Sequence, residues 1–260
     1  MKHTRLIIAL LLVAAVGFTA CSDDDSNEPS NMATLAISLT DAPADYDAVN
    51  ITFAEVAVSM EGGWIVLSGA PQTINLLEWN NGKSIEIGRG DIEPGSITQI
   101  RLMVSDAEVV VDGQTHSVTI PSAEQTGLKL ITNFDVVAGV TYELVVDFDA
   151  HQSIVTTGPP HNPNGYKLKP TLRVVEKAVT GSISGTVTNF ADAPLAIALQ
   201  GGMEVTSTPV DQTDGSFRLS YLDPGTYDIR IEDVNGLVYT ENDITVTAGD
   251  DTAIGEVTLL

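Results

Sequence analysis

The sequence predicts an all-β protein, with two antiparallel β-sandwich domains in tandem after a cleaved signal peptide and a flexible tether. Apolar and polar residues alternate over many short stretches, and turn residues recur between them. No window keeps a period of about 3.6 residues over the length of an ordinary helix. Many short strands separated by turns are typical of antiparallel sandwiches.

In the first half of the chain, the alternation is clearest over Ala33–Leu39 and Val49–Val58. Asp112-Gly113 has the residues of a two-residue type I′ hairpin turn. One helical turn is expected around Leu76–Trp79. Other strands are expected at Ile97–Val104, Glu108–Val111, Gln114–Ile120, Tyr142–Phe148 and Tyr166–Val175. Pro170 implies an edge position for the last, because proline cannot donate to a sheet ladder.

The second half continues the pattern after a boundary near Glu176–Thr180. Tyr227 directly follows the turn around Pro224-Gly225, which predicts a tyrosine that pins a sandwich connection to neighbouring backbone. The strands expected here are Ser182–Val187, Leu195–Gln200, Ser216–Leu222, Tyr227–Glu232, Leu237–Tyr239, Asp243–Thr247 and Ala253–Leu259. The predicted organisation is therefore a signal peptide (1–20), an acidic tether (21–32), a candidate ligand-binding sandwich (33–177) and a second sandwich (180–260).

The first 21 residues have the order of a secretory signal. Lys2, His3 and Arg5 precede the uncharged, mostly apolar run Leu6–Phe18, which is shorter than the roughly 20 residues of a membrane-spanning helix. Small residues and Cys21, the one cysteine of the chain, follow. This arrangement predicts export from the cytoplasm.

The segment Phe18-Thr19-Ala20-Cys21 resembles the bacterial lipoprotein box. The resemblance implies cleavage before Cys21 and lipid attachment to it, although Phe18 replaces the more usual Leu, Val or Ile. The alternative is an ordinary signal followed by a free thiol. Ser22-Asp23-Asp24-Asp25 resembles the acidic tag of lipoproteins exported to the outer face of the outer membrane, and a merely soluble acidic tether is its alternative.

Charge narrows the choice of partners. The chain has 12 basic and 35 acidic residues, a formal net charge of −23. Such a surface repels nucleic-acid phosphates and anionic lipid headgroups. We therefore expect no nucleic-acid partner, and membrane association through the N-terminal lipid alone.

Four segments carry a family resemblance in the first domain: Leu39–Pro43, Gly127–Leu130, Asp147-Phe148-Asp149 and Tyr166–Pro170. Over 33–176 the chain resembles domain of unknown function 4382, a β-rich segment of prokaryotic secreted and lipid-anchored proteins. The resemblance implies a fold and an extracellular setting, but no reaction.

The second domain resembles the carboxypeptidase-regulatory-like (transthyretin-like) domain. Gly185-Thr186-Val187, Thr213–Phe217 and Pro224–Tyr227 carry the similarity, in that order along the chain. The resemblance implies a seven-stranded sandwich that serves as an accessory module on secreted and surface proteins.

Asp147, Asp149 and His151 are the candidate metal ligands. In an extended strand, side chains two apart point the same way, so these three would share one face. Oxygen ligands suit calcium, and an imidazole favours zinc or another transition metal. The alternative is the solvent face of a strand whose other face is core. A complete site would also need distant ligands, for example Asp41, Asp45 or His161.

Three further features have two interpretations each. Asp41, Asp45 and Asp47 suit either a calcium loop or ordinary turn chemistry. Trp64 and Trp79 could stack on a sugar ring, or anchor a sandwich core. The stretch His151–Gly165 reads as a long recognition loop or a plain connector.

The sequence contains no Gly-x-Ser-x-Gly elbow, His-Glu-x-x-His pair or phosphate-binding glycine loop. We therefore expect no catalytic residues, and no cofactor beyond the divalent cation just described. The predicted function is that of a surface-exposed, lipid-anchored adhesion protein that binds a glycan or an extracellular protein. The alternatives are a structural subunit of an envelope or fimbria-like assembly and, third, a metal-dependent hydrolase.

Overall fold

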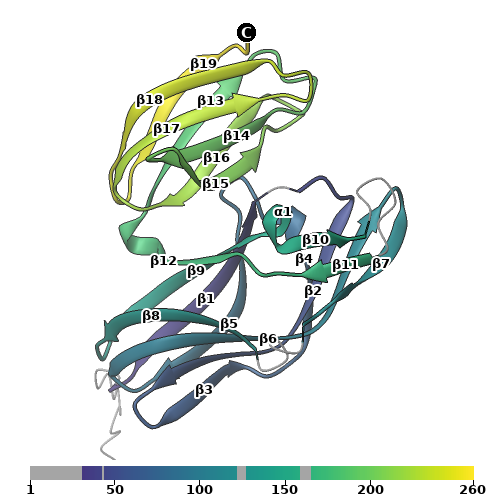
Figure 1. The fold of residues 1–260 in the computed structure, drawn as a ribbon. Helices are drawn as coiled ribbons and strands as arrows, with labels where there is room; N and C mark the ends of the chain where they lie inside the picture. Colours follow the sequence, from purple (N-terminus) through teal and green to yellow (C-terminus); the bar gives the residue numbers. More distant parts are fainter. Residues whose placement is uncertain (1–30, 43, 122–126, 159–164) are drawn as a thin grey trace, which may run out of the picture.

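The computed structural model describes residues 31–42, 44–121, 127–158 and 165–260. Within them the chain forms two β-sandwiches, the first at the bottom of Figure 1 and the second at the top. The predicted all-β fold class is confirmed. The signal peptide, Cys21 and His161 lie outside the described residues, so their predicted roles stay predictions.

Among the described residues, the first domain has twelve strands in two sheets. The four-stranded sheet has the order β12-β9-β1-β5, and β1 runs parallel to β9 at its centre. The larger sheet has the order β10-β11-β7-β6-β2-β3, with β4 paired to β2 and β8 paired to β6. The strands are β1 Ala33–Ala42, β2 Ala48–Met60, β3 Gly63–Ser68, β4 Gln72–Asn75, β5 Ile85–Ile92, β6 Gly95–Val111, β7 Gln114–Thr119, β8 Leu128–Val136, β9 Thr141–Asp149, β10 Ile154–Thr157, β11 Gly165–Leu168 and β12 Leu172–Glu176.

The alternating apolar residues of the strands form the core of the first domain. Leu35, Ile37 and Leu39 of β1 are fully buried between the sheets, as are the apolar residues of β2 and β6 that face them. The predicted hairpin is confirmed, since Asp112 and Gly113 have φ values of 49° and 71° between β6 and β7. The predicted helical turn is a 3-10 helix, η1 (Leu76–Glu78).

The prediction of one strand over Tyr166–Val175 is wrong. The segment divides into β11 and β12, which belong to different sheets. Pro170 lies in the gap, where its ring removes a donor and restricts the residue before it. The chain therefore crosses here from one sheet of the sandwich to the other. The predicted loop His151–Gly165 likewise holds a helix, α1 (Ala150–Ser153), and β10.

The second domain begins after the 3-10 helix η3 (Lys177–Val179) and has a separate core. Its sheets have the orders β16-β13-β19 and β15-β14-β17-β18. Tyr227 Oη donates to Asp223 O at 2.9 Å, which confirms the predicted tyrosine corner. The two strands expected across 237–247 are one strand, which bends at Asp243 with a φ of 60°. The strands are β13 Gly181–Val187, β14 Leu195–Gln200, β15 Met203–Pro209, β16 Ser216–Leu222, β17 Gly225–Glu232, β18 Val238–Val246 and β19 Asp251–Val257.

The loop after η1 in the first domain contacts the second domain. Asn81, in the left-handed region at φ 53°, is its central residue. Its Nδ2 donates to Pro209 O at 2.9 Å, and its Oδ1 accepts from Thr208 Oγ1 at 2.9 Å and from Arg218 N at 3.0 Å. The Asn81 side chain therefore forms hydrogen bonds with a backbone group and a hydroxyl of β15 and with a backbone group of β16.

Candidate functional site

The structure does not bring the predicted metal triplet together. β9 ends at Asp149, whose Oδ1 accepts from Gln152 N at 2.8 Å and thereby caps α1. His151 lies on this helix and is exposed. The expectation that His151 shares a strand face with Asp147 is wrong, because the strand has ended two residues earlier.

Asp147 is instead part of the domain interface. Its carboxylate is buried and pairs with Arg173 Nη2 of β12 at 2.7 Å. Thr206 of the second domain donates to the same oxygen, Oδ2, at 3.2 Å. Arg173 Nη1 also donates to Tyr221 O of β16 at 2.7 Å. At Asp147 the outward face of β9 is thus covered by the second domain rather than by solvent, whereas Thr141 and Glu143 on the same face are exposed.

Asp41 lies on the strand next to β9. Its Oδ1 accepts from Ala150 N at 3.0 Å, while its buried Oδ2 has no hydrogen-bond partner. Burial raises the pKa of Asp41 well above its ordinary value, and the nearby charges of Asp147 and Asp149 act in the same direction. Burial also raises the pKa of Asp149, against the hydrogen bond from Gln152 N.

In the part of the chain that the structure describes, no group of three or more His, Cys, Asp or Glu side chains could hold a metal ion. Asp47, from the predicted calcium loop, accepts from Gly113 N at 2.8 Å and so supports the hairpin turn. Trp79 packs against the first core, whereas Trp64 is 37% exposed on β3 with the Arg101 guanidinium 4.2 Å from its ring centroid.

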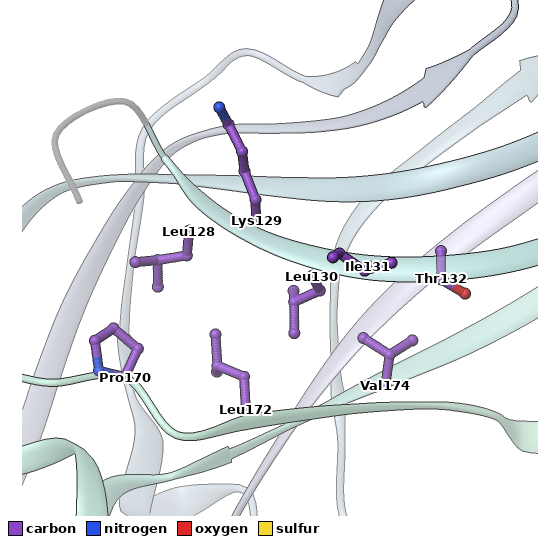
Figure 2. A pocket seen from close by; sticks show the side chains of 8 residues that line it. All are labelled: Leu128, Lys129, Leu130, Ile131, Thr132, Pro170, Leu172 and Val174. Atoms are coloured by element: carbon purple, nitrogen blue, oxygen red, sulfur yellow. The ribbon is translucent and has the colours of Figure 1, made fainter. Parts of the chain in front are cut away.

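A groove with a cavity of about 420 Å³ lies between β8 and β12, and six of its eight lining residues are apolar. Figure 2 shows Leu128 and Leu130 of β8 facing Pro170, Leu172 and Val174 across it. We call this the edge groove. Sequence reasoning did not predict β8 as a strand, although the alternation of Leu128, Leu130 and their polar neighbours was a usable signal.

Strand register explains why the edge groove is apolar. Leu172 pairs with Phe148 and Val174 with Val146, so both share the core face of β9. On the opposite sheet Leu130 pairs with Ile100, again a core residue. The groove therefore lies at one side of the sandwich, where Leu172 and Val174 of β12 are partly exposed and Leu128 and Leu130 of β8 are buried beneath them.

Both strands have a free long edge. Within the described residues, β12 pairs only with β9 and β8 pairs only with β6. A free edge presents N–H and C=O groups that another strand can use. A register shift in β8, between Ile131 and Phe134, interrupts its ladder and confines the regular edge to the first half of the strand.

The opposite side of the same sandwich is closed. There β5 and β3 meet closely enough that a Cβ on Gly88 would lie 3.1 Å from Val56 Cγ1 and 3.2 Å from Leu67 Cβ. Glycine at this position lets the two sheets approach. The first domain thus has one sealed side and one open side.

The fold and the edge groove define a tandem β-sandwich protein with an open side on its first domain. The chain belongs to the family described as domain of unknown function (DUF4382), whose model matches residues 32–170, more than half of the sequence. Segments that carried the resemblance, Gly127–Leu130 and Tyr166–Pro170, supply residues on both sides of the groove. No curated protein matches the chain.

Solved structures show only remote likeness. The Bacillus anthracis TIE protein matches at 13% identity and a TM-score of 0.24, over 88% of this chain and 51% of that one. The major pilin subunit BcpA of Bacillus cereus matches at 10% and 0.20, over 87% and 69%. The fimbrial anchor protein Mfa2 from Porphyromonas gingivalis matches at 11% and 0.19, over 80% and 82%. The chain spans about half of the first of these, and at such TM-scores none carries an argument about function.

The described residues include no helix with the length and apolar character needed to cross a bilayer. The predicted lipid on Cys21 concerns a residue outside that range.

Proposed function

We propose that this protein is a non-catalytic binding protein of the cell surface, and that its edge groove takes up an extended segment of another protein by strand addition. The observation that carries the proposal is the coincidence of an apolar groove with a free strand edge on each side. A strand of a partner would supply backbone groups to one edge and alternate apolar side chains to the groove.

The chemistry of the groove favours a polypeptide over a sugar. Its facing side chains are those of Leu128, Leu130, Leu172 and Val174, together with Pro170, and they offer no hydrogen-bonding group. Recognition of a glycan depends on several converging polar side chains, and among the residues that line this groove only Lys129 and Thr132 have one. A backbone strand needs polar partners only along its edges, which β8 and β12 provide.

The sequence supports the setting of this activity. The lipoprotein-like segment around Cys21 and the acidic residues after it favour a lipid-anchored protein on the outer face of the outer membrane. The likeness of 180–260 to the carboxypeptidase-regulatory-like domain favours an accessory role for the second sandwich. A subunit of an envelope or fimbria-like assembly would use the groove in the same way, with a neighbouring subunit as the partner.

The test is selection of peptides about eight residues long from a displayed random library, a length typical of strands. Leu130→Phe with Leu172→Phe fills the groove with apolar volume, and Val66→Phe, on the exposed face of β3, is the matched control. Selected peptides should bind the wild type and the control alike and the filled variant at least tenfold more weakly. They should also slow amide hydrogen exchange in β8 or β12. Equal binding to the filled variant, or protection confined to other strands, would refute the proposal.

A further inference from the structure

The lysines of the described chain are distributed unevenly. Every described arginine and Lys177 forms an ion pair with a carboxylate, at 2.6–3.1 Å. Four lysines form none: Lys83, Lys129, Lys167 and Lys169. Four of the ten described basic residues are therefore unpaired, and all four are lysines.

Three of those four lysines lie on, or directly before, segments that line the edge groove. Lys129 lies on β8 between Leu128 and Leu130, and its side chain points away from the apolar floor in Figure 2. Lys167 and Lys169 lead into Pro170 on the other side. All three are exposed.

Carboxylates are missing from the same two segments. No Asp or Glu occurs between Leu128 and Phe134, or between Gly165 and Val175. The nearest acidic residue on β8 is Asp135, which accepts a hydrogen bond from Ser96 Oγ. The two segments that contribute residues to the groove thus carry basic side chains and no acidic ones, on a strongly acidic molecule.

We infer that the segment that enters the edge groove carries carboxylate side chains beside its apolar ones. This inference rests on the proposed function and specifies its partner. The net charge of −23 repels an acidic segment from most of the surface, while the lysines attract it at the groove. Such complementarity contributes more to the rate and specificity of association than to affinity.

The probes are three synthetic peptides of one design and about eight residues. Each has Val and Ile at alternate positions, with Glu, Gln or Lys at the positions between them. Binding is measured by fluorescence anisotropy to the full mature chain at low and high salt. The Glu peptide should bind best and the Lys peptide worst, and the difference should shrink at high salt because exposed charges are screened.

The variant with Lys129→Gln, Lys167→Gln and Lys169→Gln should lose about tenfold in affinity for the Glu peptide, as expected for roughly three exposed ion pairs. Its affinity for the Gln peptide should not change. Lys83→Gln is the matched control, since Lys83 is also exposed and unpaired but lies in the loop beside the second domain. Lys129→Gln alone removes one charge, as Lys83→Gln does. It should change the logarithm of the affinity by about a third as much as the triple variant.

The outcomes separate the two proposals. Equal binding of the Glu and Gln peptides to wild type, lost in the filled-groove variant, would overturn the acidic partner and leave the groove as a strand acceptor. Binding of the Glu peptide that the filled groove does not weaken, or that Lys83→Gln weakens as much as Lys129→Gln, would overturn both. Failure of all three peptides to bind would also count against both.

Discussion

The two sides of the first sandwich are built from the same kinds of strand and end differently. On one side β3 and β5 approach over Gly88, where a Cβ would be tightly packed. On the other side a cavity of about 420 Å³ lies between β8 and β12. All four are edge strands, so glycine on β5 and proline at the sheet crossing, and not free edges, distinguish the two sides. The difference shows that an open side of a sandwich is a local construction rather than a general weakness of packing.

The open side also depends on the second domain. β12 has a sheet neighbour on one edge only, and its Arg173 binds both Asp147 and Tyr221 O. These contacts hold β12 from its outer face. On the closed side, β5 is instead supported from its inner face by β3 of the opposite sheet. The second sandwich thereby fixes one wall of the edge groove.

The largest expected effect is therefore that of Arg173→Met. It leaves the carboxylate of Asp147, which is 7% exposed, without its cation. Loss of one partner of a buried pair costs about 3 kcal/mol of unfolding free energy. Denaturant unfolding and amide hydrogen exchange should show a less stable chain with faster exchange in β12.

Arg230→Met is the control for that experiment, because Arg230 and Glu232 are both about 40% exposed. It should change stability by less than about 0.5 kcal/mol. Asp147→Asn in the Arg173→Met background should recover part of the loss by removing the buried charge. A loss no larger than that of the control would show that the second domain does not support β12.

The next largest expected loss of stability is that of a substitution on the closed side, and comparing it with one on the open side tests the difference between them directly. Gly88→Val should destabilise the chain by about 2 kcal/mol, because the added carbons meet the backbone-proximal atoms of Val56 and Leu67. Leu130→Phe with Leu172→Phe adds more carbon atoms, on the open side, and should cost less than about 1 kcal/mol, since the groove has room.

Thermal melts measure both variants, with Gly69→Ala as the control. A Cβ on Gly69 would meet only Val66 Cγ1, at an ordinary 3.7 Å. If the filled-groove variant lost as much stability as Gly88→Val, the two sides would be equally packed and the comparison would fail.

The smallest expected change in stability is that of a substitution at Asp41, near the end of β1. Its raised pKa means that the folded chain binds this proton more tightly than the unfolded chain does. The cost of ionising it is therefore present above the folded pKa and disappears as pH falls toward the ordinary value. Asp41→Asn keeps the acceptor for Ala150 N and should stabilise the chain by about 1 kcal/mol at neutral pH.

Melting temperatures from pH 4.5 to 8 check this prediction. The gain should be about 2–4 °C at neutral pH and should shrink as pH falls. Asp192→Asn, at an exposed residue, provides the baseline. A gain that stayed constant with pH would show that Asp41 does not titrate in this range.

Sequence patterns predicted the strands whose alternation is uninterrupted, such as β1 and β2, and the hairpin at Asp112-Gly113. They missed β5, because Gly88, Gly90 and the charges between its isoleucines break the pattern. They also missed β8, whose regular alternation at Leu128 and Leu130 is short and ends at a register shift between Ile131 and Phe134. The outward direction of Asp147 was predictable from its period of two, but the second domain that covers it was not.

The edge groove could not be predicted for a related reason. Leu130 and Leu172 are far apart in the sequence and lie on strands that do not pair with each other. Alternation indicates that both face a core, and it contains no information on whether the strands beside them close that core.

The position of β1 bears on how the chain folds. It is central in its sheet and lies parallel to β9, so that Thr34 pairs with Thr141, 107 residues further along. The second domain has the same arrangement: β13 lies parallel to β19, and Ser182 pairs with Asp251, 69 residues later. Contacts between such distant residues slow folding, because a long loop must close before they form. In each sandwich the sheet that contains this pair can therefore be completed only after the later strand, β9 or β19, has been synthesised.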